Sequence, residues 1–304
     1  MYKRQVLNGT IKNDSFLPVL YELDKTEEWK DIKCWQKANP GLGTIKQYKY
    51  LNEQVQRAKD DSSSKRGILC KDFNIRTTSE EKWLDFDTVN NEETYKLEEL
   101  SGSYAIGGAD LSSTTDLTCA TLLVIKKQKI YIIQHYFIPE DKLEEKEGDD
   151  KVPYKKWKER GLLTTCTGAK VDYSDVTKWF LKMHKEMDIS ALWVGYDPWG
   201  STYWINEMKD EGFEMEEVVQ GAKTMSNPMK QLEADLKEKK VNYNNNPITK
   251  WCLLNTSIKI DDNDNIRPVK GKKSRQRIDG AVSLIDAYVV LYRKMQDYLA
   301  MQEE

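Results

Sequence analysis

Three short apolar segments follow one another closely in the middle of the chain. They cover residues 103–110 (SYAIGGAD), 117–125 (LTCATLLVI) and 129–137 (KIYIIQHYF), and polar segments of turn length separate them. Runs rich in Val, Ile, Leu and Tyr between such turns are typical of β-strands. Because the links are too short for a crossover helix, the pattern predicts three consecutive antiparallel strands.

Helical and extended patterns alternate after these strands. Residues 189–196 (ISALWVGY) form a nearly continuous apolar run, which is typical of a strand buried on both faces. Helices are expected at residues 174–187, 201–211, 227–240 and 279–300, and further strands at 213–219 and 258–260. The fold class is therefore α/β, a mixed sheet with helices on both faces. Residues 140–160 carry many charges of both signs and are expected to form an exposed excursion.

The first hundred residues have a different pattern of apolar and polar positions. Residues 29–43 (WKDIKCWQKANPGLG) and 48–64 mix helical stretches with breaks at Asn-Pro-Gly and Asp-Asp-Ser-Ser, and they lack a strong strand pattern. We therefore expect a mostly helical accessory region in residues 1–100 and one α/β domain in residues 101–304.

The amino-acid composition argues against several classes of protein. Charged residues make up 32% of the chain, no apolar run approaches a membrane span, and the N-terminus lacks the apolar core of a signal peptide, so secretion and membrane insertion are not expected. The five scattered cysteines form no C-x-x-C pair, which argues against a zinc ribbon or a disulfide scaffold. With only two histidines but 50 acids, oxygen-ligand metal chemistry is favoured over imidazole chemistry. The net charge of -3 does not by itself favour a nucleic-acid partner, but a near-neutral total is compatible with modest, salt-sensitive DNA binding where cations are concentrated locally.

Two aspartates stand at the carboxyl ends of expected strands. Asp110 follows a Gly-Gly-Ala segment that is too small to cover it, and Asp197 closes the apolar strand at residues 189–196. Open α/β sheets bind ligands at the carboxyl ends of their strands, so the two carboxylates meet if these strands are neighbours. The alternatives are a turn residue for Asp110 and a helix cap for Asp197.

A third aspartate, Asp279, begins the final expected helix. Residues 267–277 before it (RPVKGKKSRQR) contain six cations and no acid. A nuclease needs this combination, because Lys and Arg hold phosphate beside a metal that carboxylates hold. The expected DNA-binding residues are Lys270, Lys272, Lys273, Arg275 and Arg277. The alternatives are a helix-capping role for Asp279 and a merely solvated basic loop.

Three convergent carboxylates would form a site for two cations about 4 Å apart. Oxygen ligands favour two Mg²⁺ or Mn²⁺ ions over zinc. Asp116 and Asp286 are further candidates: Asp116 is interpreted first as a turn residue. Asp286 lies about 10 Å along the helix from Asp279, too far to share a metal with it. It is expected either to contact the metal ligands without binding the metal itself, or to lie at the surface.

Other residues carry weaker signals. His135, in an expected strand, and His184, on an expected helix, are interpreted as packed or exposed side chains rather than metal ligands. The nine tryptophans are interpreted first as core residues, and the alternative for Trp199 is a wall of the site beside Asp197. The phosphate-binding pattern G-x-x-x-x-G-K-[ST] does not occur in the sequence, so this chain is not expected to hydrolyse ATP.

Four separated segments carry a more specific pattern. They are GGADLSSTTDLTCATLLV, GYDPWGSTYWINEM, NNPITKWCLLN and KKSRQRIDGAVSLIDAY. In this order they resemble the large terminase subunit of tailed double-stranded DNA bacteriophages. The resemblance implies a nuclease domain of ribonuclease H-like fold from about residue 100 onward, with metal-binding acids at Asp110, Asp197 and Asp279. Residues 1 to about 75 resemble the end of the packaging ATPase domain, and the family often has an apolar residue or an amide at the position of Asp286.

The resemblance further implies a metal-dependent endonuclease that cuts concatemeric phage DNA in the cytoplasm of the bacterial host. It implies double-stranded DNA, portal protein, small terminase subunit and procapsid as partners. The missing ATPase half is expected to reflect either an excised fragment or a split or truncated gene. Two alternatives stay open: another ribonuclease H-like nuclease, of the transposase, integrase or resolvase type, and a non-catalytic docking remnant of the packaging motor.

Overall fold

The structure is a computed structural model, and it describes residues 6–7, 12–75, 80–112, 117–199, 202–261, 263–271 and 276–303. The chain divides into two compact units, Met1–Thr78 and Ser79–Glu304, each with its own internal contacts. None of the helices in the described part of the chain combines the length and the apolar character that a membrane span requires.

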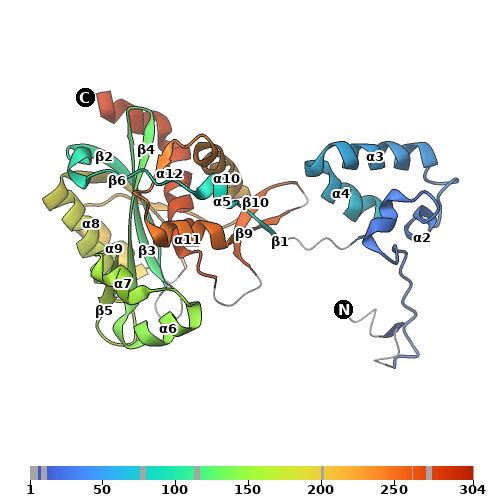
Figure 1. Ribbon diagram of the computed structural model, residues 1–304, viewed down its shortest axis with the longest axis horizontal. Coiled ribbons are helices and arrows are strands. Elements are labelled where there is room, and N and C mark those ends of the chain that lie inside the picture. The colour runs from blue at the N-terminus through green and yellow to red at the C-terminus, as the bar shows by residue number, and fades with distance from the viewer. Residues whose placement is uncertain are drawn as a thin grey trace. The chain divides into compact units, whose positions relative to one another are not determined.

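The described elements of the first unit are helical. They are η1 (Thr26–Lys30), α2 (Trp35–Ala38), α3 (Tyr48–Asp60) and α4 (Ser62–Phe73) (Figure 1). One face of α3 buries Leu51, Val55 and Ala58, whose spacing is that of a helix stripe turned toward a core. The buried indole of Trp35 donates a hydrogen bond to the Trp29 carbonyl at 2.8 Å, so its polar atom is satisfied inside this core.

The second unit begins at Ser79, before the boundary near residue 100 that the sequence texture suggests. Residues 80–100 hold β1 (Glu80–Lys82), α5 (Phe86–Val89) and η2 (Leu97–Leu100). Trp83, Leu84 and Val89 are buried in the core of the second unit, and the Trp83 indole donates to Glu233 at 3.2 Å. The polar residues after Val89 therefore mark a surface stretch of this unit rather than its start.

A mixed sheet forms the centre of the second unit. Its described strands are β2 (Ser103–Asp110), β3 (Thr118–Lys126), β4 (Lys129–Pro139), β5 (Leu163–Cys166), β6 (Ile189–Tyr196), β7 (Met215–Glu217) and β8 (Val241–Asn242). The order is β5-β4-β3-β2-β6-β7, and β8 also pairs with β4. β2, β3 and β4 are antiparallel, while β6 joins β2 in parallel. The expected mixed α/β sheet is thus confirmed.

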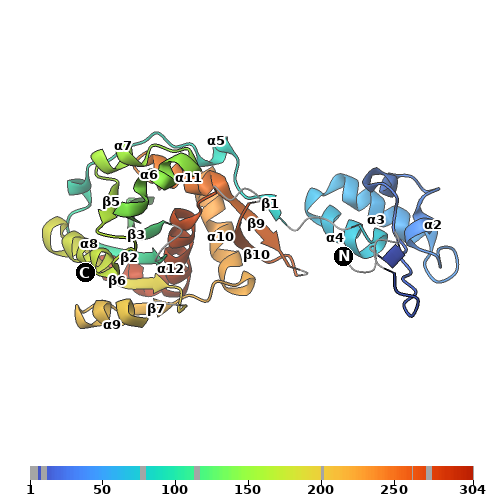
Figure 2. The same cartoon turned by 90° about the horizontal axis from the view of Figure 1, so that it is seen from below.

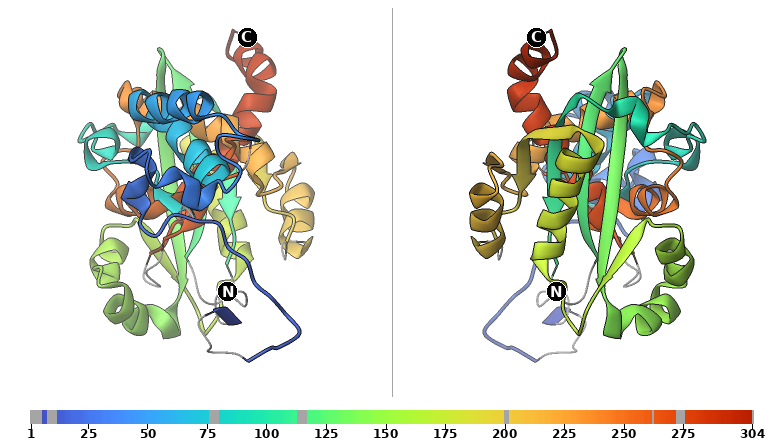
Figure 3. Two further views of the ribbon diagram at one scale, coloured as in Figure 1. Left: turned by 90° about the vertical axis from the view of Figure 1, so that its right-hand side faces the viewer. Right: turned by 90° about the vertical axis from the view of Figure 1, so that its left-hand side faces the viewer.

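Helices cover both faces of the sheet (Figures 2 and 3). On one face lie α10 (Ala222–Lys237), α11 (Pro247–Asn255) and α12 (Asp279–Glu303), and on the other α8 (Tyr173–Met187) and α9 (Thr202–Asp210). Neighbouring strand residues alternate between the two cores: Ile106 and Leu123 pack with α12, whereas Ala105 and Leu122 pack with α8. Burial on both faces explains why these strands are continuously apolar.

Residues 140–160 differ from the exposed excursion that their charge suggests. They form η3 (Glu140–Lys142), α6 (Leu143–Asp150) and α7 (Tyr154–Glu159). Tyr154 and Trp157 are buried with ring centroids 5.3 Å apart, and both pack against Trp251 of α11. The two aromatic residues are three positions apart on a short helix and so reach the core together, while the charged residues between them face solvent.

A second, three-stranded sheet leads the chain toward α12. Within the described residues it has the order β1-β9-β10, with β9 at Thr256–Ile260 and β10 at Ile266–Lys270. β10 is antiparallel to β9 and ends at Lys270, inside the basic segment that precedes Asp279. The basic segment therefore connects this small sheet to the helix that covers the main one.

Candidate active site

Asp110 and Asp197 lie at adjacent strand ends. β2 and β6 are parallel neighbours, and Ala109 pairs with Tyr196, so the two aspartates occupy the next position of the same register. Neighbouring strands are about 4.8 Å apart. The topology therefore brings together two acids that are far apart in sequence.

The side chains of Asp110 and Asp197 lie on the face of the sheet that α12 covers. Alternate residues of a strand point to the same face, so Asp110 shares the face of Gly108 and Asp197 that of Gly195. A Cβ atom at Gly108 would lie 2.2 Å from the Ser283 carbonyl oxygen, and one at Gly195 would lie 2.9 Å from another carbonyl oxygen of α12. The missing side chains let α12 touch the backbone of both strands beside the two acids.

Asp279 is the first residue of α12 and is only 4% exposed. A buried hydrogen-bond network holds this end of the helix. Gln134 of β4 donates to the Gly280 carbonyl at 2.7 Å and to the Thr121 hydroxyl at 2.8 Å. Ser283 shares a 2.6 Å hydrogen bond with the Thr121 hydroxyl and donates to a β2 carbonyl at 3.0 Å. Asp279 is thereby fixed relative to β2, β3 and β4.

Cys119 is a buried residue of β3 beside the end of β2. Cys119 pairs with Asp110 across β2 and β3. Burial raises the pKa of this thiol, and the charges of Asp110 and Asp279 raise it further.

Asp286 is completely buried, which excludes a surface position, one of the two alternatives that the sequence leaves open for it. Its Oδ2 accepts a long hydrogen bond of 3.5 Å from Gln220, and its Oδ1 has no hydrogen-bond partner among the described residues. Burial raises the pKa of Asp286 well above its ordinary value, and the charges of Asp110 and Asp197 raise it further. The helical spacing from Asp279 is readable in the sequence, but this burial is not.

Asp197 sits in a turn rather than at a helix cap. Its carboxylate accepts a hydrogen bond from the Trp199 backbone at 3.2 Å, and α9 begins only at Thr202. Burial raises the pKa of Asp197, and the charge of Glu217 on β7 raises it further. The side chain of Trp199 is 87% exposed next to this acid.

The four aspartates offer only oxygen ligands, the donor set that Mg²⁺ and Mn²⁺ prefer. Burial raises the pKa values of Asp197 and Asp286, and a divalent cation would stabilise such carboxylates in the charged form. Among the described residues, no three His, Cys, Asp or Glu side chains stand in ready-made ligand spacing. The fit to a cation therefore rests on the register that places Asp110 beside Asp197 and on the burial of Asp279 at the start of α12.

The family model described as "Terminase large subunit, endonuclease domain" matches residues 10–294. The chain belongs to this family. It is 30% identical over 305 residues to Protein YmfN of Escherichia coli K12, which covers 95% of this chain and 66% of that protein. It is 26% identical over 275 residues to the large terminase subunit of Enterobacteria phage HK97, which covers 87% of this chain and 52% of that protein.

The crystal structure of the HK97 bacteriophage large terminase superimposes with a TM-score of 0.66 at 22% identity, covering 95% of this chain and 60% of that chain. This likeness shows the fold, and the expected ribonuclease H-like fold is confirmed. The chain spans about half to two thirds of the length of these relatives.

The basic segment of this terminase nuclease is only partly described. Lys270 is exposed at the end of β10. Arg277 instead forms a two-pronged ion pair with Asp150 of α6, at 2.8 Å and 2.9 Å. This arrangement differs from the expected DNA contact, because the guanidinium faces the protein. The remaining expected residues, Asp116, Lys272, Lys273 and Arg275, lie outside the described residues.

Neither histidine adjoins the aspartates of the terminase site. His135 lies 2.7 Å from the Thr164 hydroxyl and stacks on Trp179, and burial lowers its pKa to about 4. His184 is exposed and lies 2.9 Å from the Ser190 hydroxyl. Both side chains are packed or exposed, as the sequence suggests.

Sequence reasoning missed the residues that position α12. Gln134 and Thr121 sit inside apolar strands and Ser283 inside an apolar helix, and all three are buried. Their signal was present: a polar side chain buried in an otherwise apolar run needs a hydrogen-bond partner. Which partner each one takes depends on the contact between distant elements.

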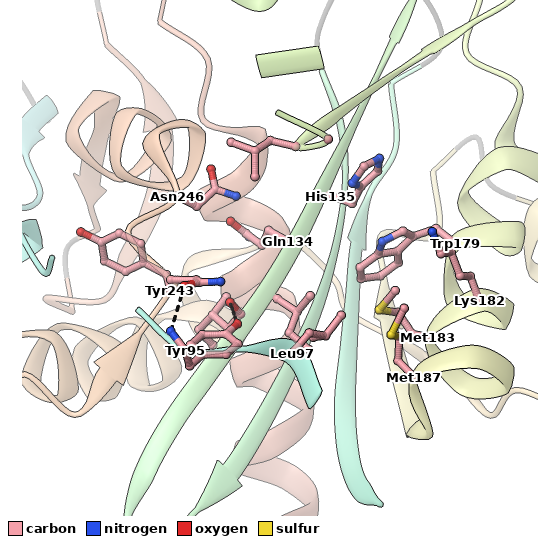
Figure 4. A pocket seen from close by; sticks show the side chains of 15 residues that line it. Tyr95, Leu97, Gln134, His135, Trp179, Lys182, Met183, Met187, Tyr243 and Asn246 are labelled. Carbon is pink, nitrogen blue, oxygen red and sulfur yellow. Dashed lines mark hydrogen bonds between the residues drawn. The ribbon is translucent and has the colours of Figure 1, made fainter. Parts of the chain in front are cut away.

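A cavity of about 290 Å³ lies at the edge of β4, away from the aspartates (Figure 4). Trp179 and Met183 of α8 line one side of it, and Tyr95 and Tyr243 line the other. Among the described residues that line it there is no Asp or Glu. It is therefore distinct from the candidate metal centre.

Proposed function

We propose that this chain is a metal-dependent DNA endonuclease of a phage genome-packaging terminase, which cuts concatemeric double-stranded DNA. One observation carries the proposal: Asp110 and Asp197 share a register position at the ends of parallel strands, under the helix that begins with Asp279. Membership of the terminase endonuclease family supports the same activity.

Asp110, Asp197 and Asp279 would hold two Mg²⁺ or Mn²⁺ ions. Such ions supply an activated water and stabilise the leaving oxygen in phosphodiester hydrolysis. The carboxylates orient the reacting phosphate, and the network through Gln134 keeps Asp279 at the strand ends. Lys270, with Lys272, Lys273 and Arg275, would bind the DNA backbone, and such contacts position DNA without reading its sequence.

The test is plasmid cleavage in Mn²⁺ with the variants Asp110→Asn and Asp279→Asn. Each is expected to abolish cleavage and to keep the circular dichroism spectrum of the native protein, because Asn has nearly the same shape as Asp. Full activity of the double variant would contradict the assignment of Asp110 and Asp279 as metal ligands. Strand transfer with a specific DNA end would instead indicate a transposase-type enzyme, and DNA binding without Mn²⁺ binding in calorimetry would indicate a docking remnant.

The wider assignments are part of the same proposal. Portal protein, small terminase subunit and procapsid would be the partners, and the cytoplasm of the bacterial host the place of action. Residues 1–78 would be the end of the packaging ATPase domain. ATP hydrolysis is not expected, because the sequence has no phosphate-binding loop.

A further inference from the structure

The outer edge of β4 pairs with two different strands, and a gap separates them. The first residues of β4 pair with β8, and the residues from Tyr136 onward pair with β5. The N–H of Ile130 donates to the Lys240 carbonyl on this edge, and the N–H of Tyr136 donates to the Leu162 carbonyl. Alternate residues of a strand direct their backbone groups to the same side, so the backbone of Gln134 points into the gap.

The N–H and C=O groups of Gln134 have no hydrogen-bond partner among the described residues. Its side chain is turned into the core, where it bonds to Thr121, Thr249 and the Gly280 carbonyl. The residue therefore presents a backbone donor beside a backbone acceptor to the cavity of about 290 Å³ that it lines. Such a pair matches any planar group that carries an acceptor next to a donor.

Asn246 brings a further polar group to the same cavity. The residue is only 6% exposed, and it lines the cavity opposite α8 (Figure 4). Its Oδ1 accepts hydrogen bonds from the backbone N–H groups of Ile248 and Thr249, at 2.9 Å and 3.5 Å, and so caps α11. The amide nitrogen donates to no described residue, which leaves it to a ligand.

The walls of the cavity are aromatic and apolar. Trp179, Met183 and Met187 of α8 line one side, and Tyr95 lines the other. The Tyr95 hydroxyl donates to the Ile132 carbonyl at 2.8 Å, which fixes its ring beside the edge of β4. Planar unsaturated rings pack favourably against aromatic side chains and thioethers. The walls therefore favour a flat heterocycle.

The charge of the lining limits the ligand further. Lys182 of α8 is the one Lys or Arg among the described lining residues, and none of these residues is an acid. Its side chain is exposed and makes no ion pair within the described part of the chain. The cavity lies at the small end of the usual range for ligand sites, about 300–1,000 Å³. It therefore suits one ring system with a short anionic group.

We propose that this cavity binds a nucleotide, with the base between α8 and Tyr95 and the phosphate at Lys182. Each nucleobase carries a donor beside an acceptor on its pairing edge, which matches the backbone of Gln134, and Asn246 adds a third contact. The nucleotide is either free or an unstacked residue of single-stranded DNA. None of the candidate metal-binding aspartates lines the cavity, so the proposal does not depend on the cleavage chemistry.

The test measures binding of the four deoxynucleoside 5′-monophosphates to the full chain by calorimetry. EDTA is present, so that no metal ion holds the phosphate elsewhere. At least one monophosphate is expected to bind with a dissociation constant below about 1 mM. Asn246→Asp keeps an oxygen to cap α11 but replaces the amide donor with a negative charge, so it should weaken this binding at least about tenfold.

Asn245→Asp is the matched control. It adds the same charge at the next position, but Asn245 does not line the cavity, and its Oδ1 accepts a hydrogen bond from Lys250 at 3.1 Å. Its affinity for the monophosphate should equal that of the native chain. Absence of monophosphate binding to the native chain overturns the proposal, as does equal binding by Asn246→Asp and Asn245→Asp.

Lys182→Gln separates the phosphate contact from the base contact, and it changes an exposed side chain, so it serves also if Asn246→Asp does not fold. It should weaken monophosphate binding about two- to fivefold and leave binding of the uncharged nucleoside unchanged. Lys185→Gln, exposed on the same helix but outside the cavity, is its control. An unchanged ratio of nucleotide to nucleoside affinity in Lys182→Gln overturns the proposal.

A short single-stranded oligodeoxynucleotide of the preferred base identifies the source of the nucleotide. If Asn246→Asp weakens its binding as much as that of the monophosphate, the cavity takes a base of single-stranded DNA. If the oligodeoxynucleotide binds equally to the native chain and to Asn246→Asp while the monophosphate does not, the cavity takes the free nucleotide.

Discussion

Arg277 and Asp150 form an ion pair that is closed off from solvent. Their side chains are 13% and 1% exposed, and the guanidinium holds both carboxylate oxygens, at 2.8 Å and 2.9 Å. The change Arg277→Met keeps an aliphatic stem but leaves the Asp150 charge buried. The Tyr154 hydroxyl, at 2.7 Å, would still donate a hydrogen bond to it.

Removing one partner of a buried pair lowers the free energy of unfolding by about 3–5 kcal/mol, because the other charge stays in the core without compensation. For a unit of this size, each kcal/mol shifts the melting temperature by about 2–4 °C. We therefore expect Arg277→Met to lower the melting temperature of the nuclease unit by roughly 6–20 °C.

Scanning calorimetry of the full chain, with DNA binding measured below the transition, checks this expectation. The double variant Arg277→Met/Asp150→Asn is the control: it removes the stranded charge and keeps an acceptor for Tyr154, so it should recover most of the lost stability. If Arg277→Met loses DNA affinity while its stability falls by less than about 1 kcal/mol, the guanidinium binds DNA and the structural reasoning is refuted.

Two further expectations concern the packing of α12 and the titration of a histidine. Gly108→Ala would place Cβ 2.2 Å from the Ser283 carbonyl oxygen, so α12 must move. The free energy of unfolding should therefore fall by about 1–3 kcal/mol, and the rate of Mn²⁺-dependent cleavage should fall with it. Urea unfolding measures the stability and plasmid cleavage measures the activity. Gly148→Ala is the control, because no atom lies within 4 Å of a Cβ at that position. Equal stability of the two variants would contradict the expectation for Gly108→Ala. The pKa of His135 is lowered to about 4 by burial, so the unfolded chain takes up a proton first as the pH falls below 6.5, and stability should fall by about 2.5 kcal/mol between pH 6.5 and pH 4. His135→Gln should reduce that slope in urea titrations, and identical slopes would rule the explanation out.

The sequence predicts the strands that carry the site better than the segments around them. Residues 103–110 and 189–196 become β2 and β6 with the expected limits. Their signal is local, because a strand buried on both faces must be apolar throughout and must end where polar groups begin. Residues 140–160 show the opposite case: the charges dominate the composition, but Tyr154 and Trp157 decide the packing.

Long-range contacts decide what the local patterns leave open. The sequence names Asp110 and Asp197 as strand-end acids, but only the parallel pairing of β2 with β6 makes them neighbours. Helical spacing places Asp286 on the face of Asp279, but its burial follows from the approach of α12 to the two strands. Neither relation has a trace in the residues next to these positions.

The sequence by itself determined the element types, the α/β class and the acids worth testing, because periodicity, strand ends and residue chemistry are properties of short segments. The tertiary structure decided which acids meet, which one is buried without a compensating partner, and that Arg277 pairs with an acid 127 positions away. These outcomes depend on the order of strands in the sheet and on how closely one helix packs against it. They are settled only when the whole chain folds.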